Sequence, residues 1–301
     1  MLKTLIKQYL NGRSEEYQYI DLLKDILDNG EMIEGRNGKV KTCIGSSMIF
    51  SLENNKIPIL TTKKVAYKTC LRELLWFISG KTDNKILQDQ NVKIWNGNAS
   101  REFLDSRGLH DLSENDLGPV YGHQWRHFNA EYSDCKTDYN NKGVDQLDYI
   151  IKCLKDPVER YSRRLIISAW NPCQLNEMAL PPCHLLMQFN VVGDKLSCTM
   201  YQRSCDMGLG VPFNITSYCY LTHLIAHHCG LNPSEFIYHL GNIHIYDDHL
   251  DSMEKQILRT PYDFPTIKIL KTHENIDEYE FSDFLVENYI SHDNIKMEMR
   301  K

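Results

Sequence analysis

The sequence contains no apolar run close to the ~20 residues that a membrane-spanning helix needs. Its first stretch, M-L-K-T-L-I-K-Q-Y-L, lacks both a long apolar core and a small-residue cleavage site, so it does not resemble a secretory signal. Internal repeats, low-complexity tracts and Gly/Ser linkers are also missing. We therefore expect one globular domain over residues 1–301, located in the cytoplasm.

Cysteine pairs with metal-ligand spacing are missing as well. Ten cysteines are scattered through the 301 residues without a C-x-x-C motif, and outside a secretory context they indicate reduced thiols. Neither zinc nor disulfides are implied, and we expect no metal. The net charge of −6 argues against a general nucleic-acid binder, which usually has a concentrated basic face. With 42% hydrophobic residues, the chain can bury a full core.

The strongest chemical signal lies between Met178 and Tyr220. Within it, Cys183 stands between Pro182 and His184 at the start of the apolar, strand-like run Leu185 to Val192. Prolines fix φ near −65° and have no N–H to donate, so the thiol is held at the entrance of the strand. A thiol with a pKa of about 8.5 becomes a good nucleophile when a nearby cation favours its thiolate. Cys183 is therefore a candidate nucleophile, and a buried structural cysteine is the alternative.

A hairpin would bring a cation to this thiol. The strand-like runs Leu185 to Val192 and Lys195 to Gln202 are separated by Gly193-Asp194, a residue pair typical of tight hairpins. Folding back at this pair brings Arg203 towards the level of Cys183. The alternative is a surface arginine that has no role in the chemistry.

Other helices and strands follow from the spacing of apolar residues and from capping and stop signals. We expect helices over Glu15 to Asp28, Tyr67 to Ser79, Asp145 to Lys155 and Ile215 to Cys229, and further strands over Ser46 to Leu52, Leu165 to Trp170 and Leu240 to Tyr246. In the last strand His244 and Tyr246 share one face. Ile243 and Ile245 share the other, so the polar pair would face a site and the apolar pair the core.

Several motifs together resemble the thymidylate synthase family. They are M-A-L-P-P-C-H, Y-Q-R-S-C-D-M-G-L-G-V-P-F-N, E-L-L-W-F, S-R-R-L-I-I-S-A-W-N-P and H-I-Y, and the similarity extends from about Ser14 to Met299. The resemblance implies an α+β fold with a large mixed β-sheet packed with helices, one face of which forms a homodimer interface. The lengths around Leu109 to Leu117 and Glu131 to Gly143 are closer to the eukaryotic and large-virus forms.

The resemblance also implies a reaction. It is the reductive methylation of dUMP to dTMP, with 5,10-methylenetetrahydrofolate as donor of both the one-carbon unit and the hydride. Dihydrofolate is released, and the reaction proceeds through a covalent adduct between Cys183 and carbon 6 of the uracil. The implied partners are dUMP, a reduced folate and a second copy of the chain. No metal, membrane or nucleic acid is required.

The family's functional residues carry over to the positions that match its motifs. The implied catalytic residues are Cys183, Glu73, Tyr121, Asn214, Arg203, His184 and Asp206. The residues expected to bind dUMP are Arg36, Arg163, Arg164, Arg203, Ser204, Asp206, Asn214, His244 and Tyr246. Those expected to bind the folate are Trp95, Asn98, Asp206, Leu209, Gly210, Phe213 and Met299.

Pattern alone favours plainer interpretations for many of these residues. Glu73 would be a solvent-facing glutamate, Trp95 a core residue and Tyr121 a packing residue, while Arg36 would be merely solvated. Asn214 would be the cap of the following helix. By resemblance its amide instead presents one donor and one acceptor to the uracil edge, which favours deoxyuridylate over deoxycytidylate.

The arginine pair Arg163 and Arg164 is implied to reach the nucleotide phosphate of the partner subunit. By pattern alone, the two arginines would be solvent-exposed residues at the edge of the sheet. The sequence departs from the family at two places. The loop after Arg36 lacks the usual R-T-G-T-G-T pattern, and Arg300 with Lys301 replaces a small apolar end in the segment that closes over the folate.

Three other functions remain open. A deoxycytidylate-type hydroxymethylase would capture the methylene with water, and Asn214 argues against it. A cysteine hydrolase would pair Cys183 with His184 or His244, although no orienting carboxylate is evident. A non-catalytic role, for example in binding RNA, is the third.

Overall fold

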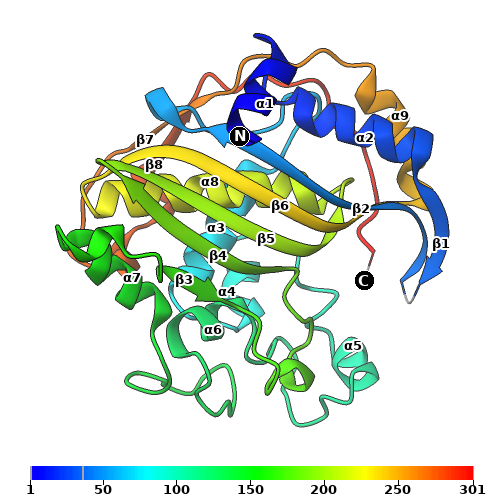
Figure 1. Cartoon of the computed structure of the whole chain (residues 1–301). Helices are drawn as coiled ribbons and strands as arrows, with labels where there is room; N and C mark the ends of the chain where they lie inside the picture. Colours follow the sequence, from blue (N-terminus) through cyan, green and yellow to red (C-terminus); the bar gives the residue numbers. More distant parts are fainter. Residues whose placement is uncertain (1, 36, 301) are drawn as a thin grey trace.

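A six-stranded mixed β-sheet runs through the computed structural model, which describes residues 2–35 and 37–300 (Figure 1). In hydrogen-bonded order its strands are β1 (Glu31–Gly35), β2 (Gly38–Ser51), β6 (Asn232–Tyr246), β5 (Lys195–Asp206), β4 (His184–Val192) and β3 (Ile166–Ser168). Strands β5 and β6 are parallel, and the other neighbouring pairs are antiparallel. A separate pair consists of β7 (Thr266–Ile269) and β8 (Phe284–Glu287).

The helices are α1 (Leu2–Leu10), α2 (Tyr17–Asn29), α3 (Tyr67–Ile78), α4 (Asn84–Asp89), α5 (Arg101–Ser106), α6 (Tyr121–His127), α7 (Gln146–Lys155), α8 (Gly210–His228) and α9 (Leu250–Ile257). Among these described helices, none has the length and apolar character needed to cross a bilayer. The combination of a mixed sheet with packed helices confirms the α+β prediction.

The two faces of the sheet have different environments. Helix α8 packs against one face and α3 packs against α8, while Figure 1 shows no described helix in front of β4, β5 and β6 on the other face. In β4, Met187 and Phe189 are fully buried, whereas Leu186 and Gln188 remain partly exposed. Because successive side chains in a strand point to opposite faces, this alternation separates a helix-covered face from an open face.

The predicted hairpin between β4 and β5 is confirmed. Val192 pairs with Lys195, and Gly193 has φ +65°. A glycine with positive φ at the first position of a two-residue turn matches the right-handed twist of the flanking strands. At the other end of β4, the register shifts between His184 and Leu186. The bulge therefore lies next to the candidate nucleophile.

Helix α8 begins at Gly210, earlier than the predicted start at Ile215. Its first turn is stabilised by the Asp206 carboxylate, which accepts hydrogen bonds from the N–H groups of Gly208 (2.9 Å), Leu209 (3.2 Å) and Gly210 (3.2 Å). Pro212 is tolerated because the first turn of a helix needs no N–H donor at that position. Asn214 consequently lies inside the helix, and the interpretation of Asn214 as a helix cap is wrong.

Three strands also differ in length from prediction. Strand β6 begins at Asn232 rather than at Leu240, β2 begins at Gly38 rather than at Ser46, and β3 is limited to Ile166–Ser168. The early part of β2 is mostly polar and carries little sequence signal, whereas the early part of β6 contains Phe236, Ile237 and Tyr238 and was missed. Both parts are extended because each pairs with neighbouring strands along its length.

A buried carboxylate joins α2 to the loop that leads into α3. Glu16 is completely buried and accepts four hydrogen bonds, from the backbone N–H groups of Thr61 (2.8 Å) and Thr62 (2.8 Å) and from their hydroxyls (2.7 and 2.6 Å). Buried charges require such partners. The contact fixes the loop immediately before Lys63, which reaches the candidate site.

We expect Glu16→Gln to destabilise the fold by about 2–4 kcal/mol, because the new amide group cannot accept on both sides and leaves buried donors unpaired. Urea unfolding followed by circular dichroism measures this change. Asp28→Asn is the matched control, since Asp28 lies on the same helix and is exposed. An equal, small effect of both substitutions would contradict the role given to Glu16.

Candidate active site

Cys183 lies just before β4, where a guanidinium from β5 reaches it. The backbone N–H of Arg203 donates to the Cys183 carbonyl (2.9 Å), and its Nε and Nη2 donate to the carbonyls of Pro182 and Pro181 (both 2.8 Å). Nη2 also lies 3.8 Å from the Cys183 Sγ atom. The hairpin thus brings Arg203 to the thiol, as the sequence predicts.

The electrostatic balance at the thiol still favours the protonated form. Burial raises the pKa of Cys183 above its ordinary value, Arg203 acts in the opposite direction, and the nearby Asp206 raises the pKa further. In the chain alone, desolvation therefore outweighs the guanidinium.

A layer of aromatic side chains lies against Cys183. The Cys183 N–H donates to the Tyr121 hydroxyl (2.7 Å), and the Tyr121 ring stacks on His184 with centroids 4.2 Å apart. Nδ1 of His184 lies 2.9 Å from the hydroxyl of Tyr218. Burial lowers the pKa of His184 to about 3, so its imidazole is neutral. Tyr218 was not among the predicted site residues.

Glu73 on α3 faces the interior rather than solvent, with a relative exposure of 6%. Its Oε1 accepts a hydrogen bond from the Trp95 indole N–H (2.7 Å). Burial raises the pKa of Glu73 to about 7, and the bond from Trp95 acts against that rise. The Trp95 ring also contacts Tyr121, with centroids 6.2 Å apart. Glu73 and Trp95 therefore belong to the same cluster as the tyrosine bound to Cys183.

The segment after β5 forms the next part of the site. The Asp206 carboxylate is occupied by the N–H groups at the start of α8, and Lys63 donates its ammonium to the Gly208 carbonyl. Burial lowers the pKa of Lys63 to about 8, and Asp206 opposes this shift. Nothing in the spacing around T-T-K-K singles out Lys63, so sequence reasoning missed it.

Strand β6 brings His244 beside this segment. Asp206 pairs with His244 in the parallel ladder, and Nδ1 of His244 lies 2.9 Å from Oδ1 of Asn242. The rings of His244 and Tyr246 are 5.3 Å apart, and the intervening Ile245 is fully buried. Asn242 is a second neighbour that the sequence analysis did not identify.

The remaining predicted residues vary in position. Asn98 is buried, Phe213 packs against the core, and Ser204, Leu209 and Gly210 are partly exposed near Arg203 and Asp206 in the chain. Asn214 is 9% exposed on α8. Arg163 and Arg164 are exposed in the turn before β3, and neither makes an ion pair with a described residue. Arg36 lies outside the described residues.

The segment that contains Met299 packs against the turn after β6. Arg300 forms ion pairs with Asp247 (2.7 Å) and Asp248 (2.9 Å), and its guanidinium lies 5.5 Å from the centre of the Tyr246 ring. Nε2 of His249 lies 2.8 Å from the Glu298 carbonyl oxygen. Met299 itself is 52% exposed.

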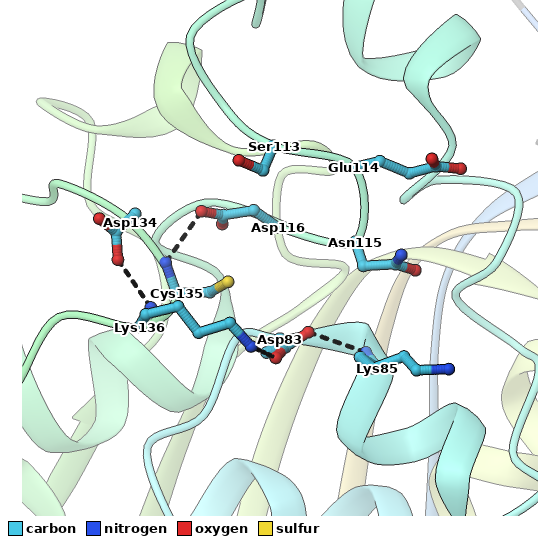
Figure 2. A pocket seen from close by; sticks show the side chains of 9 residues that line it. All are labelled: Asp83, Lys85, Ser113, Glu114, Asn115, Asp116, Asp134, Cys135 and Lys136. Carbon is cyan, nitrogen blue, oxygen red and sulfur yellow. Dashed lines mark hydrogen bonds and ion pairs between the residues drawn. The ribbon is translucent and has the colours of Figure 1, made fainter.

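A polar hollow of about 310 Å³ lies elsewhere, and none of its lining residues belongs to the site above (Figure 2). The carboxylates of Asp83, Asp116 and Asp134 already have partners within the chain. Asp83 accepts hydrogen bonds from the Lys85 N–H and the Lys136 ammonium, and Asp116 accepts from the Cys135 N–H. Within the described part of the chain, no group of three or more His, Cys, Asp or Glu side chains is placed to hold a metal ion.

The raised pKa of Glu73 predicts a pH-dependent effect on stability. Below pH 4.5, the ordinary pKa of a glutamate, the carboxyl is protonated in both the folded and the unfolded state. Between pH 4.5 and about 7 the carboxyl ionises in the unfolded chain but stays protonated in the folded protein, so the folded state loses stability as pH rises. Glu73→Gln should therefore gain stability relative to the original protein as pH rises, by about 3 kcal/mol above pH 7. Urea unfolding between pH 4.5 and 8.5 measures this, with the exposed Glu102→Gln as control. A pH-independent difference would contradict the buried, titrating state of Glu73.

Comparison with known proteins assigns the chain to a family. The family model described as thymidylate synthase matches residues 17–301. The chain is 48% identical over 302 residues to the thymidylate synthase of Saccharomyces cerevisiae, covering 96% of this chain and 99% of that protein. It is also 49% identical over 294 residues to the bifunctional dihydrofolate reductase-thymidylate synthase of Paramecium tetraurelia, covering 97% of this chain and 63% of that protein. With the corresponding bifunctional protein of Zea mays it shares 50% identity over 298 residues, covering 98% of this chain and 56% of that protein.

The chain thus spans about half to two thirds of the length of these bifunctional relatives. Its match to the yeast protein extends over almost the whole of both sequences. The chain belongs to the thymidylate synthase family.

Proposed function

We propose that this chain catalyses the reductive methylation of dUMP to dTMP, with 5,10-methylenetetrahydrofolate as donor of the one-carbon unit and the hydride. The observation that carries the proposal is the position of Cys183, whose thiol lies 3.8 Å from the Arg203 guanidinium and whose backbone N–H donates to the Tyr121 hydroxyl. Family membership supports it independently.

The chemistry begins with the Cys183 thiolate, which Arg203 stabilises. Carbon 5 of uracil is a poor nucleophile, so the thiolate first adds to carbon 6 and makes an enolate whose charge extends to O4. Carbon 5 then bonds to the one-carbon unit of the folate. Tyr121 assists removal of the C5 proton as tetrahydrofolate leaves. Hydride from that folate reduces the exocyclic methylene, and Cys183 departs, so the products are dTMP and dihydrofolate.

Asn214 selects the base in this proposal. A carboxamide offers both a donor and an acceptor, which match O4 and N3–H of uracil. It sits within α8 and is nearly buried, so the helix restricts its orientation. The charge on O4 is stabilised by Asn214 together with groups around Glu73 and His184.

The other substrate groups have separate binding residues. His244 and Tyr246 bind the deoxyribose, and Arg203 and Ser204 contribute to nucleotide binding, as does Arg36. Asp206 contributes to both substrates. The folate is bound by Trp95, Asn98, Leu209, Gly210, Phe213 and Met299. The backbone N–H groups already bound to Asp206 support its role, because they hold the carboxylate in one orientation.

A homodimer completes each site. The open face of the sheet supports this, because it leaves apolar side chains such as Leu186 and Ile237 partly exposed, and Tyr201 42% exposed, at the centre of the fold. Arg163 and Arg164 are exposed and make no ion pair with a described residue, so they are available to a phosphate of the partner subunit. A cytoplasmic location is also proposed, and the ten free thiols support it.

The absorbance change of dihydrofolate formation tests the proposal directly. We expect it from methylenetetrahydrofolate with dUMP but not with dCMP. Cys183→Ala should abolish it, lowering turnover by at least about 10³-fold, and should prevent covalent labelling by a fluorinated dUMP in the presence of folate. Cys173→Ala is the matched control because that thiol is exposed and free. Nucleotide consumed without dihydrofolate would favour a hydroxymethylase, and full activity of Cys183→Ala would reject the mechanism.

Arg300 is expected to help hold the folate-covering segment in place. Arg300→Ala removes both ion pairs and the contact with Tyr246, so KM for the folate should rise about two- to fivefold. The difference in KM between the original protein and Arg300→Ala should shrink as the salt concentration is raised, since exposed ion pairs are screened. The exposed Lys296→Ala is the control in the same segment. A KM unchanged by the Arg300 substitution at low salt would contradict this role.

A further inference from the structure

A histidine held by two tyrosines lies directly behind Cys183. The His184 ring stacks on Tyr121 at an interplanar angle of 18°, while its Nδ1 lies 2.9 Å from the Tyr218 hydroxyl. The relative exposures are 8% for His184 and 3% for each tyrosine. Tyr121 contacts Cys183 through the backbone, whereas the Tyr218 hydroxyl is hydrogen-bonded, among the described residues, to His184.

Because it is buried, His184 is a neutral imidazole, with its pKa lowered to about 3. A neutral imidazole has one N–H donor and one lone-pair acceptor, so its chemical role depends on which nitrogen holds the hydrogen. Nδ1 is occupied by Tyr218. Nε2, on the other side of the ring, has no hydrogen-bond partner among the described residues.

The Tyr218 hydroxyl determines which nitrogen is protonated. Burial raises the pKa of Tyr218 well above its ordinary value, so the phenol keeps its hydrogen. That hydroxyl has no hydrogen-bond partner other than Nδ1 within the described chain. If Nδ1 carried the hydrogen and donated it, the buried phenolic O–H would have no acceptor there, which is unfavourable. If Tyr218 donates to an unprotonated Nδ1, both groups are satisfied.

We propose that Tyr218 is a positioning residue that donates its hydroxyl hydrogen to Nδ1 of His184 and thereby fixes the tautomer with the proton on Nε2. The consequence for catalysis rests on the proposed function. In this tautomer His184 is a hydrogen-bond donor, directly or through water, to the negative charge that develops on O4 when Cys183 adds to carbon 6. In the other tautomer Nε2 would present a lone pair to that charge and oppose it.

The packing of Tyr218 makes the hydroxyl direction well defined. Its ring is stacked on Phe236 of β6, with centroids 5.7 Å apart and an interplanar angle of 16°. It follows Asn214 by one helical turn on α8, and residues four apart lie on the same face of a helix. One helix therefore carries both the proposed base-reading amide and the hydroxyl that sets the state of His184.

Nitrogen-15 NMR of histidine-labelled protein tests the assignment without turnover. The His184 signals are those that disappear in His184→Gln. We expect a protonated-type shift at Nε2 and an unprotonated-type shift at Nδ1; the reverse would overturn the proposal. The measurement is independent of the reaction. A protein with the expected tautomer that forms no dihydrofolate would reject the proposed function and retain the tautomer.

Tyr218→Phe tests the consequence, because it removes only the hydroxyl. We expect His184 to become a mixture of tautomers and kcat to fall about tenfold, with KM for dUMP changed by less than about twofold. Tyr220→Phe is the matched control on the same helix, with 1% exposure and a hydroxyl bonded to no described residue. An unchanged tautomer in Tyr218→Phe, or a fall in kcat equal to that of the control, would overturn the proposal.

Discussion

The candidate site depends on the contact of one guanidinium with the two carbonyl groups that precede Cys183. Pro181 and Pro182 have no N–H groups, so the chain cannot extend the β4 ladder through them with a full set of bonds. Arg203 replaces that ladder with two hydrogen bonds of 2.8 Å to their carbonyls. The same side chain is thereby held near the Cys183 sulfur. Strand pairing, the bulge after Cys183 and the electrostatics of the thiol are thus all linked to Arg203.

Burial shifts the titrating groups of the site towards their neutral forms. It raises the pKa of Glu73 and Cys183 and lowers that of His184 and Lys63. Burial of Glu73 lowers the stability of the fold at neutral pH, because its carboxyl ionises more readily in the unfolded chain than in the folded protein. In return, a charge that develops on the substrate meets oriented donors rather than mobile counter-charges. Donor direction, more than net charge, therefore determines which species the site stabilises.

Local signals in the sequence were sufficient to predict the elements that have a recognisable turn or a continuous apolar run. Gly193-Asp194 predicted the hairpin, and the apolar run Leu185 to Val192 predicted the strand β4. The start of α8 was missed because Gly208, Gly210 and Pro212 are usually helix-terminating, and the carboxylate that stabilises this turn comes from Asp206. Asp206 lies four residues before Gly210, the first residue of the helix, so it does not stand at the position where a capping residue is expected.

Side chains that act through burial were harder to predict. On pattern, Glu73 belongs to an ordinary amphipathic helix, and its buried state depends on Trp95, which lies in another segment. Lys63 and Tyr218 have no motif of their own, since each acquires its contact only when distant elements pack together. The resemblance to a family supplied the expected roles of matching residues, whereas the structure supplied the groups that hold those residues in place.

The start of β2 and the last described residues of the chain lie against each other. Gly38, the first residue of β2, has φ +102°, and a Cβ atom there would lie 2.9 Å from Nη1 of Arg300. A side chain at position 38 would therefore be strained and would also displace the guanidinium from Asp247 and Tyr246. The glycine at position 38 therefore leaves room for the guanidinium of Arg300. The start of β2 and the segment that carries Arg300 are therefore packed together, and a change in either should be judged by its effect on the other.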